Sequence, residues 1–565
     1  MDWPGAEPED GGGAAPPSPR RVLAIWAVFT LLTLGVEWPA LQGPFVSDDT
    51  IYLVFNRWVQ ELSFENVRAI MDPFGPATAY TANWAPVHLL LHAVEWRIFG
   101  QATLGYHVVN VVLHSLVSAL LVPLFVSAGV SEAAALAGGL LFLLHPANVE
   151  AVAWISELKT LVAMAFAVGA LLAHPRRPVL ATALFALGLL GKALAAFALP
   201  VVAWAELERW RRGGGRAGLA WVALWAGIFG LYAVPQLWAF QHLGDPGFPL
   251  ASDRGVAART VVAIVARYAA MVATSYGVAA FHDPARALSP LDPWFLAGVA
   301  LLALAVARAL WTLWQGTPEA GWWVWCAAAY LPVSQLRPFL YPMGDRYLYF
   351  VLPGLVGALL LAGGAALRRW ARSAGEQSRF LMSRAGLVAT VALLVVFAVR
   401  SSARATIWRS DLALFRDSAR AYPTGLSAEL LRAREAAQAG DVDGVVAAVR
   451  AAEERGFDRY VSLLTEPAFA SVRSDPRFRA LVAEVAGRWL ATAEPRHYTR
   501  WFELRWMADA HAVRDEWKEA EALLERALAV AGSQRPQLEQ DLVRARARLA
   551  EQERASGADE RATSR

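Results

Sequence analysis

The sequence contains very little cysteine and lysine, and its charges nearly cancel. One cysteine, Cys326, occurs in 565 residues, so no disulfide can form within the chain and no zinc site can rest on thiolates. Only three lysines occur, Lys159, Lys192 and Lys518, so arginine carries nearly all of the positive charge. The formal net charge is +3, which gives no global signal for nucleic-acid binding, and no nucleic-acid partner is expected.

Charged residues are sparse before about residue 400 and dense after it, while apolar residues make up 56% of the chain. This asymmetry separates a membrane part from a water-soluble part. Residues 1–20 lack periodicity and predict a disordered cytoplasmic tail. Arg20 and Arg21 then precede an apolar run without a small-residue cleavage site, which favours a retained first helix over a signal peptide.

Twelve apolar segments predict an all-α, polytopic membrane helix bundle over residues 21–402. Basic clusters at 176–177, 209–216 and 368–384 should stay in the cytoplasm. This requires one segment not to cross, and the most polar, 258–281, is assigned as re-entrant or interfacial. About eleven crossings remain, with the N-terminus cytoplasmic and the C-terminus outside. Residues 42–104 predict a first external loop with interfacial helices.

Residues 403–552 predict a soluble helical domain on the outer side of the membrane. Leu504 to Ala529 resembles one tetratricopeptide hairpin, with Ala520, Leu524 and Ala527 at the small–large–small spacing of its second helix. Residues 553–565 are polar and predict a disordered tail.

Two adjacent acids, Asp48 and Asp49, follow the first apolar segment. A carboxylate pair at a membrane surface suits acid–base chemistry better than anchoring. The alternative is that Ser47 and Asp48 cap a surface helix.

Cations at the ends of apolar segments are candidates for binding a lipid phosphate. Lys192 and Lys159 lie at membrane depth, where an ionisable side chain is costly and functional by default. Snorkelling to the interface is the alternative for both, and Glu157 could also solvate Lys159. Arg337 and Arg346 bracket a turn rich in proline and glycine, and arginine binds phosphate oxygens in two-point fashion. An ion pair of Asp345 with either arginine would fix this turn, and both functions are compatible.

Histidines give weaker signals. His145 and Glu150 could bind a metal or orient the acid pair, although a histidine before a proline at a helix end is more often a cap. His88 and His92 lie four residues apart with Glu95 nearby, but the zincin order is absent, which favours an interfacial amphipathic helix over residues 87–98. No glycine-rich phosphate loop, Ser/His/Asp set or nucleotide fingerprint stands out.

The order of these blocks resembles the transmembrane and tetratricopeptide-repeat O-mannosyltransferase family and its bacterial relatives, which are C-type (GT-C) glycosyltransferases. The blocks are the acid pair, Asn83-Trp84-Ala85-Pro86, Tyr106 to His114, His145-Pro146 through Glu150-Ala-Val-Ala-Trp154-Ile155-Ser156, Lys192, Asp345-Arg346-Tyr347-Leu-Tyr349 and Trp408. The resemblance covers roughly residues 21–420.

The resemblance implies transfer of a sugar, with mannose one candidate, from a polyprenyl-phosphate donor to a hydroxyl of a protein or envelope glycan. Asp48 or Asp49 would be the base, and Lys159, Lys192, Arg337 and Arg346 would hold the donor phosphate. His145, Glu150, Asp345 and Tyr347 would support them. A divalent cation, Mg²⁺ or Mn²⁺, on the acids is compatible with the resemblance but is not required by it.

Two other functions fit the same composition: a carrier or flippase for lipid-linked saccharides, and a membrane-anchored scaffold for helical repeats. The abundance of alanine, arginine and glycine suggests a GC-rich genome and hence a bacterial inner membrane.

Overall fold

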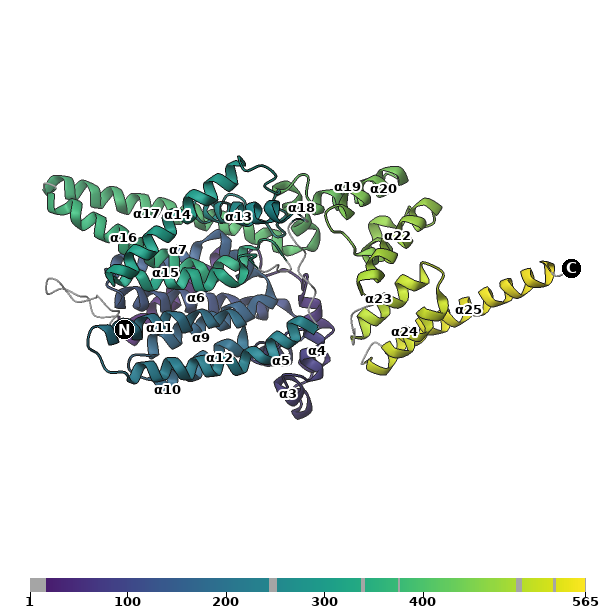
Figure 1. Ribbon diagram of the computed structural model, residues 1–565, viewed down its shortest axis with the longest axis horizontal. Coiled ribbons are helices and arrows are strands. Elements are labelled where there is room, and N and C mark those ends of the chain that lie inside the picture. The colour runs from purple at the N-terminus through teal and green to yellow at the C-terminus, as the bar shows by residue number, and fades with distance from the viewer. Residues whose placement is uncertain are drawn as a thin grey trace. The chain divides into compact units, whose positions relative to one another are not determined.

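The computed structural model describes residues 17–242, 251, 253–336, 341–373, 376–493, 500–531 and 535–563 (Figure 1). Within these ranges the chain consists of helices joined by turns and loops, and it contains no β-strand. The all-α class expected from the sequence is therefore confirmed for the described chain.

Eight helices of the described chain are long and apolar enough to cross a bilayer. They are α1 (Pro19–Glu37), α6 (Thr103–Ser127), α9 (Leu158–Ala173) together with the short turn Ile155–Glu157 before it, α12 (Ala217–His242), α13 (Arg254–Thr274), α14 (Pro293–Gln315), α16 (Leu348–Ser373) and α17 (Glu376–Ala405). A ninth span results if α7 (Glu132–Leu144) is joined to the segment Pro146–Ala153, which is bent from it by 50°. The expected helical membrane protein is confirmed at this level.

Three apolar segments that were counted among the eleven expected crossings form shorter helices. They are α10 (Pro178–Gly191), α11 (Ala198–Arg211) and α15 (Pro318–Tyr330), of 14, 14 and 13 residues. A full crossing takes about 20 residues, so the count of eleven stays a prediction. The re-entrant form expected for residues 258–281 is wrong, because α13 is one continuous helix of 21 residues.

Local sequence signals explain where the spanning helices begin and end. The Asp292 carboxylate accepts hydrogen bonds from the backbone N–H groups of Trp294 and Phe295, and Pro293 occupies the first helical position of α14. The same helix ends at Gly316, whose φ of 62° is left-handed and suits glycine.

Three of the spanning helices expose long apolar side chains. Leu31 on α1, Leu304 on α14 and Val388 on α17 are 71%, 69% and 67% exposed. Apolar surface on this scale would be unfavourable in water. A lipid bilayer is the environment that suits these faces.

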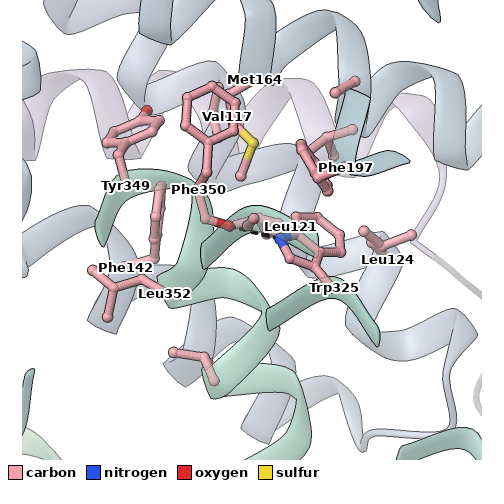
Figure 2. Close-up of a cluster of buried hydrophobic side chains, with 14 of the residues drawn as sticks. Val117, Leu121, Leu124, Phe142, Met164, Phe197, Trp325, Tyr349, Phe350 and Leu352 are labelled. Carbon is pink, nitrogen blue, oxygen red and sulfur yellow. Dashed lines mark hydrogen bonds between the residues drawn. The ribbon is translucent and has the colours of Figure 1, made fainter. Parts of the chain in front are cut away.

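The core of the membrane part is a continuous set of buried apolar side chains from α6, α7, α9, α15 and α16. Figure 2 shows Trp325 of α15 beside Phe350 of α16, with the indole N–H donating to the Phe350 carbonyl at 2.7 Å. Gly357 lets α16 approach α15 closely, because an added Cβ there would lie 2.3 Å from the Trp322 ring. Small residues at helix contacts are typical of membrane bundles.

The chain divides into two compact units. The first contains the chain before Asp72, Trp84–Leu237 and Asp245–Asp417, and the second contains Asp72–Asn83, Trp238–Gly244 and Ser418–Arg565. The division falls at residue 417 rather than near 402, where the change in composition suggested it.

The first loop contributes helices to both units. In the first unit lie η1 (Thr50–Val54), α2 (Arg57–Gln60), α3 (Phe64–Met71) and α5 (Pro86–Phe99). Helix α4 (Pro76–Thr81) belongs to the second unit, where its Tyr80 ring lies 5.6 Å from that of Phe502.

The second unit is built from paired helices. Its main helices are α19 (Leu426–Gln438), α20 (Val442–Glu453), α21 (Tyr460–Thr465), α22 (Pro476–Ala493), α23 (Trp501–Ala512), α24 (Trp517–Val530) and α25 (Arg535–Thr563); α18 (Asp411–Ala421) runs across the boundary. Helices α23 and α24 form the hairpin expected there, with Ala520, Leu524 and Ala527 buried. Its membership of the tetratricopeptide class stays a prediction.

Helix α25 continues to Thr563, which corrects the expected disordered tail after 552.

Candidate functional site

The site is built on an interruption in the membrane bundle between α7 and α9. Here the chain forms three short helices, η2 (Pro146–Asn148), α8 (Val149–Ala153) and η3 (Ile155–Glu157). Asn110 of α6 stabilises the break, because its amide donates to the carbonyls of Val152 and Trp154 at 3.2 and 3.1 Å. Backbone groups freed at membrane depth need such partners.

His145 lies at the start of this break and acts as a cap. Its Nδ1 accepts from the Ala147 N–H at 3.2 Å, and its Nε2 lies 2.9 Å from the Val272 carbonyl. Both ring nitrogens are therefore engaged with backbone, which favours the capping alternative over metal binding.

Glu157 gathers three cations. Its carboxylate lies 3.0 Å from the Lys192 Nζ, 3.8 Å from the Lys159 Nζ and 3.7 Å from the Arg346 Nε. Lys192 ends α10 and also donates to the Thr160 hydroxyl at 2.6 Å, and that hydroxyl donates to Glu157. Three of the four expected phosphate-binding cations thus meet on one carboxylate.

Arg346 is held by a second carboxylate and by aromatic rings. Its backbone N–H donates to Glu150 Oε2 at 2.7 Å, and its guanidinium pairs with Glu150 Oε1. The guanidinium carbon lies 5.1 to 5.2 Å from the ring centres of Trp154, Tyr341 and Tyr347, within the range of cation–π attraction. Glu150 and Tyr347 therefore position this arginine.

The cations in this cluster outnumber the carboxylates that pair with them directly. Lys159, Lys192 and Arg346 carry three positive charges and pair directly with only two carboxylates, Glu150 and Glu157. Their side chains are at most 18% exposed. Buried charge is costly unless it is paired, so this cluster is suited to receive an anionic ligand.

The acid pair divides into one buried and one accessible carboxyl. Asp49 is fully buried, and it accepts from the Val46 N–H at 3.0 Å, the Ser156 N–H at 2.8 Å and the Ser156 hydroxyl. Burial raises the pKa of Asp49 to about 7, although the hydrogen bonds from Ser156 and Val46 oppose this increase. Since Ser156 precedes Glu157, Asp49 ties the first loop to the turn that carries the cations.

Asp48 is half-buried. It lies between Ser47, whose φ of 52° is left-handed, and the π-helical turn η1. Non-glycine residues with positive φ and π-helical turns are concentrated at functional sites. Because Asp49 is committed to backbone and serine donors, Asp48 is the acid of the pair better placed to exchange protons.

Asp345 connects the Arg346 turn η6 (Asp345–Tyr347) to α17. Its Oδ1 lies 2.7 Å from His282 Nε2, and its Oδ2 lies 3.6 Å from Arg404 Nη2. Arg404 also pairs with Asp417 at 2.6 Å. The expected ion pair of Asp345 with Arg346 is replaced by these partners, and Arg337 lies outside the described residues.

An open cleft with about 380 Å³ of empty space lies beside the Arg346–Glu150 pair. Its walls include four aromatic residues and several polar ones. The aromatic residues are Trp154, Phe281, Tyr341 and Trp408, and the polar ones include Ser47, Glu150, His282 and Arg346. The cleft is thus lined by Arg346 of the cation cluster and by Ser47, the residue before the acid pair.

Helix α5 has its polar side inward. His88 and His92 are fully buried, and His92 Nδ1 lies 2.6 Å from Glu95 Oε2, whereas Val94 and Ile98 are 43% and 66% exposed. Burial lowers the pKa of His88 well below its ordinary value, and the nearby His92, Lys159 and Lys192 lower it further. The expected helix is present, and its exposed residues include apolar side chains and Arg97; an interfacial position stays a prediction.

Within the ranges that the structure describes, no three His, Cys, Asp or Glu side chains are grouped as a metal site would require. The divalent cation considered from the sequence stays a prediction.

Sequence reasoning did not assign the anchoring function of Ser156, the central position of Glu157, or the bridge through Arg404. Trp408 was noted only as part of a resemblance, and it lines the cleft. A serine and a glutamate beside Lys159 were visible, but their long-range partners, Asp49 and Lys192, were not.

Comparisons with protein-family models, with curated proteins and with solved structures found no match.

Proposed function

We propose that this protein is an integral membrane glycosyltransferase that moves a sugar from a polyprenyl-phosphate donor to an acceptor hydroxyl. The observation that carries the proposal is the convergence of Lys159, Lys192 and Arg346 on Glu157, one residue from the serine that holds Asp49. Cations that could bind a phosphate and acids that could accept a proton are therefore close together at one interruption of the bundle.

The cations suit the leaving group. A glycosyl phosphodiester carries one negative charge, and the phosphate monoester released from it carries about two at neutral pH. Because three cations gather at the site, they attract the donor phosphate and stabilise the additional charge that develops on it as the bond breaks. Arg346 presents a forked donor, and the lysines add point charges.

Asp48 would act as the base. It takes the proton of the acceptor hydroxyl while the hydroxyl oxygen attacks the anomeric carbon, and the bond from that carbon to the phosphate oxygen breaks. The polyprenyl phosphate leaves from the opposite side, so the configuration inverts. Asp49 would keep the loop that carries Asp48 against the turn Ile155–Glu157.

The test uses the full-length protein in lipid nanodiscs with polyprenyl-phosphate mannose and polyprenyl-phosphate glucose as donors. Envelope extract from a strain lacking the gene supplies the acceptor, and release of polyprenyl phosphate is measured. Asp48→Asn should lower the rate by 100-fold or more, which is the usual contribution of a general base. Glu65→Gln, an exposed carboxylate change in the same loop, is the control and should be neutral.

Full transfer activity in Asp48→Asn would refute the assigned base. If the wild type moves labelled donor across a vesicle membrane but never transfers its sugar, the carrier or flippase alternative is correct. If Lys192→Met and Arg346→Met leave donor binding unchanged while a partner still binds the helices after 417, the scaffold alternative is favoured.

The acceptor and the sugar can be identified separately. Mass spectrometry of envelope proteins and glycans from strains with and without the gene should show one hexose missing from a defined set of hydroxyls. Identical glycan profiles in the two strains would contradict an envelope acceptor.

A further inference from the structure

The cleft beside Arg346 contains two indole N–H groups that lack an acceptor. Trp154 and Trp408 are 6% and 3% exposed, and their rings stack with centres 5.8 Å apart. Within the part of the chain that the structure describes, neither Nε1 has a hydrogen-bond partner. Buried indole N–H groups usually have partners, so each of these requires an explanation.

Both indoles occupy fixed positions. Trp154 lies between α8 and η3, where its carbonyl accepts from Asn110 and its ring lies under Arg346. Trp408 lies in η7 (Thr406–Arg409), packed with Trp154 and with Leu414 of α18. Neither ring is needed to complete a hydrogen-bond network of the fold, and both line the cleft.

We infer that this cleft binds the carbohydrate ring of the donor, and that the indole N–H groups of Trp154 and Trp408 donate to its hydroxyl oxygens. This inference rests on the function proposed above. Aromatic walls with a few placed polar groups are typical of small-molecule sites. Sugars combine apolar C–H faces with hydroxyls, so they match these walls better than an acyl chain would.

The position of the cleft selects the donor sugar rather than the acceptor as its occupant. Arg346 borders both the cleft and the cation cluster at Glu157, so a phosphate held by the cations places an attached sugar in the cleft. Ser47, the residue before Asp48, also lines the cleft, so the anomeric carbon of a sugar held there would lie on the side of the acid pair.

The experiment compares equilibrium binding of two probes to the full-length protein in nanodiscs: polyprenyl phosphate and polyprenyl-phosphate mannose, with the glucose form as a second sugar. Trp154→Phe and Trp408→Phe remove one donor each and keep an aromatic ring. Each should weaken binding of a sugar-bearing lipid about fivefold, which is the contribution of one hydrogen bond, and should leave polyprenyl phosphate unchanged.

Trp314→Phe is the matched control, since that indole is 81% exposed on α14. Phe281→Leu at the half-buried cleft wall is a second test that keeps both indole N–H groups. It should also weaken only the sugar-bearing probe. Variants are compared after gel filtration and thermal unfolding, so that misfolded protein is identified.

Equal weakening of both probes, or no change in either, would overturn the inference. A raised KM for the acceptor with unchanged donor binding would assign the cleft to the acceptor instead and would also overturn it. These outcomes leave the proposed transferase intact if wild-type protein transfers sugar. Wild-type protein that binds neither probe refutes the proposed function itself.

Discussion

The buried carboxyl of Asp49 makes a prediction about stability that does not depend on any substrate. Burial raises its pKa from 3.8 to about 7. Between these two values the folded protein holds a proton that the unfolded chain has released, so stability falls as pH rises. One pKa unit corresponds to about 1.4 kcal/mol, so the full change is about 4 kcal/mol, of which about 2.5 to 3 kcal/mol falls between pH 5 and pH 8.

Asp49→Asn removes this titration. The amide oxygen can still accept from the Ser156 N–H, but the amide nitrogen faces the Val46 N–H in place of an acceptor, which lowers stability by about 1 to 3 kcal/mol at every pH. Wild-type protein should therefore exceed the variant in stability at pH 5 and lose about 2.5 to 3 kcal/mol of that advantage by pH 8.

Thermal unfolding in detergent micelles at pH 5, 6, 7 and 8 measures this difference. The midpoint difference between wild type and Asp49→Asn should fall by several degrees as pH rises. Glu65→Gln, an exposed carboxyl, should keep a constant difference from wild type. A wild-type-minus-variant difference that stays flat, or that grows with pH, would contradict the assignment of Asp49 as a neutral buried acid at pH 5.

Three further predictions concern the site. Burial lowers the pKa of Lys192 to about 8, so binding of polyprenyl phosphate should weaken as pH rises through 8. The Lys192→Arg variant should bind this lipid equally at pH 7 and pH 9. A wild-type affinity that does not change with pH would contradict this prediction. Asp417→Asn weakens the ion pair that holds Arg404 beside Asp345. It should lower kcat severalfold with little effect on the KM for the donor. A change in KM without a change in kcat would contradict this prediction. Asn110→Ala removes the side-chain donor to the Val152 carbonyl and one of two donors to the Trp154 carbonyl. It should lower stability by about 1 to 2 kcal/mol in thermal unfolding, and an unchanged midpoint would contradict this.

The sequence was sufficient to predict the all-α class and the membrane environment, because both depend on local composition. Apolar runs of about 20 residues identify spanning helices without any knowledge of their partners. The crossing count was harder, since the apolar runs that contain α10, α11 and α15 form helices of only 13 or 14 residues. Apolar composition does not distinguish a short helix that packs against neighbours from one that crosses.

The site was predicted in part for a related reason. An ionisable residue at membrane depth is conspicuous, and that principle singled out Lys159 and Lys192 without a structure. Arg346 was singled out by its place in a turn rich in proline and glycine. The partners of these residues were not visible, because they depend on where separate segments meet. Lys192 reaches Glu157 across 35 positions of sequence, and Asp49 reaches Ser156 across 107. The same limitation hid the replacement of an Asp345–Arg346 pair by His282 and Arg404.

The interrupted helix explains why charge can gather at this depth at all. A continuous helix would satisfy its own backbone and would present Glu150, Trp154 and Glu157 on a regular spiral. The break instead brings both glutamates to Arg346, and Asn110 satisfies the freed carbonyls from the side. Two carboxylates thus hold three cations at this break, each with a partner at a depth where an unpaired charge would cost stability.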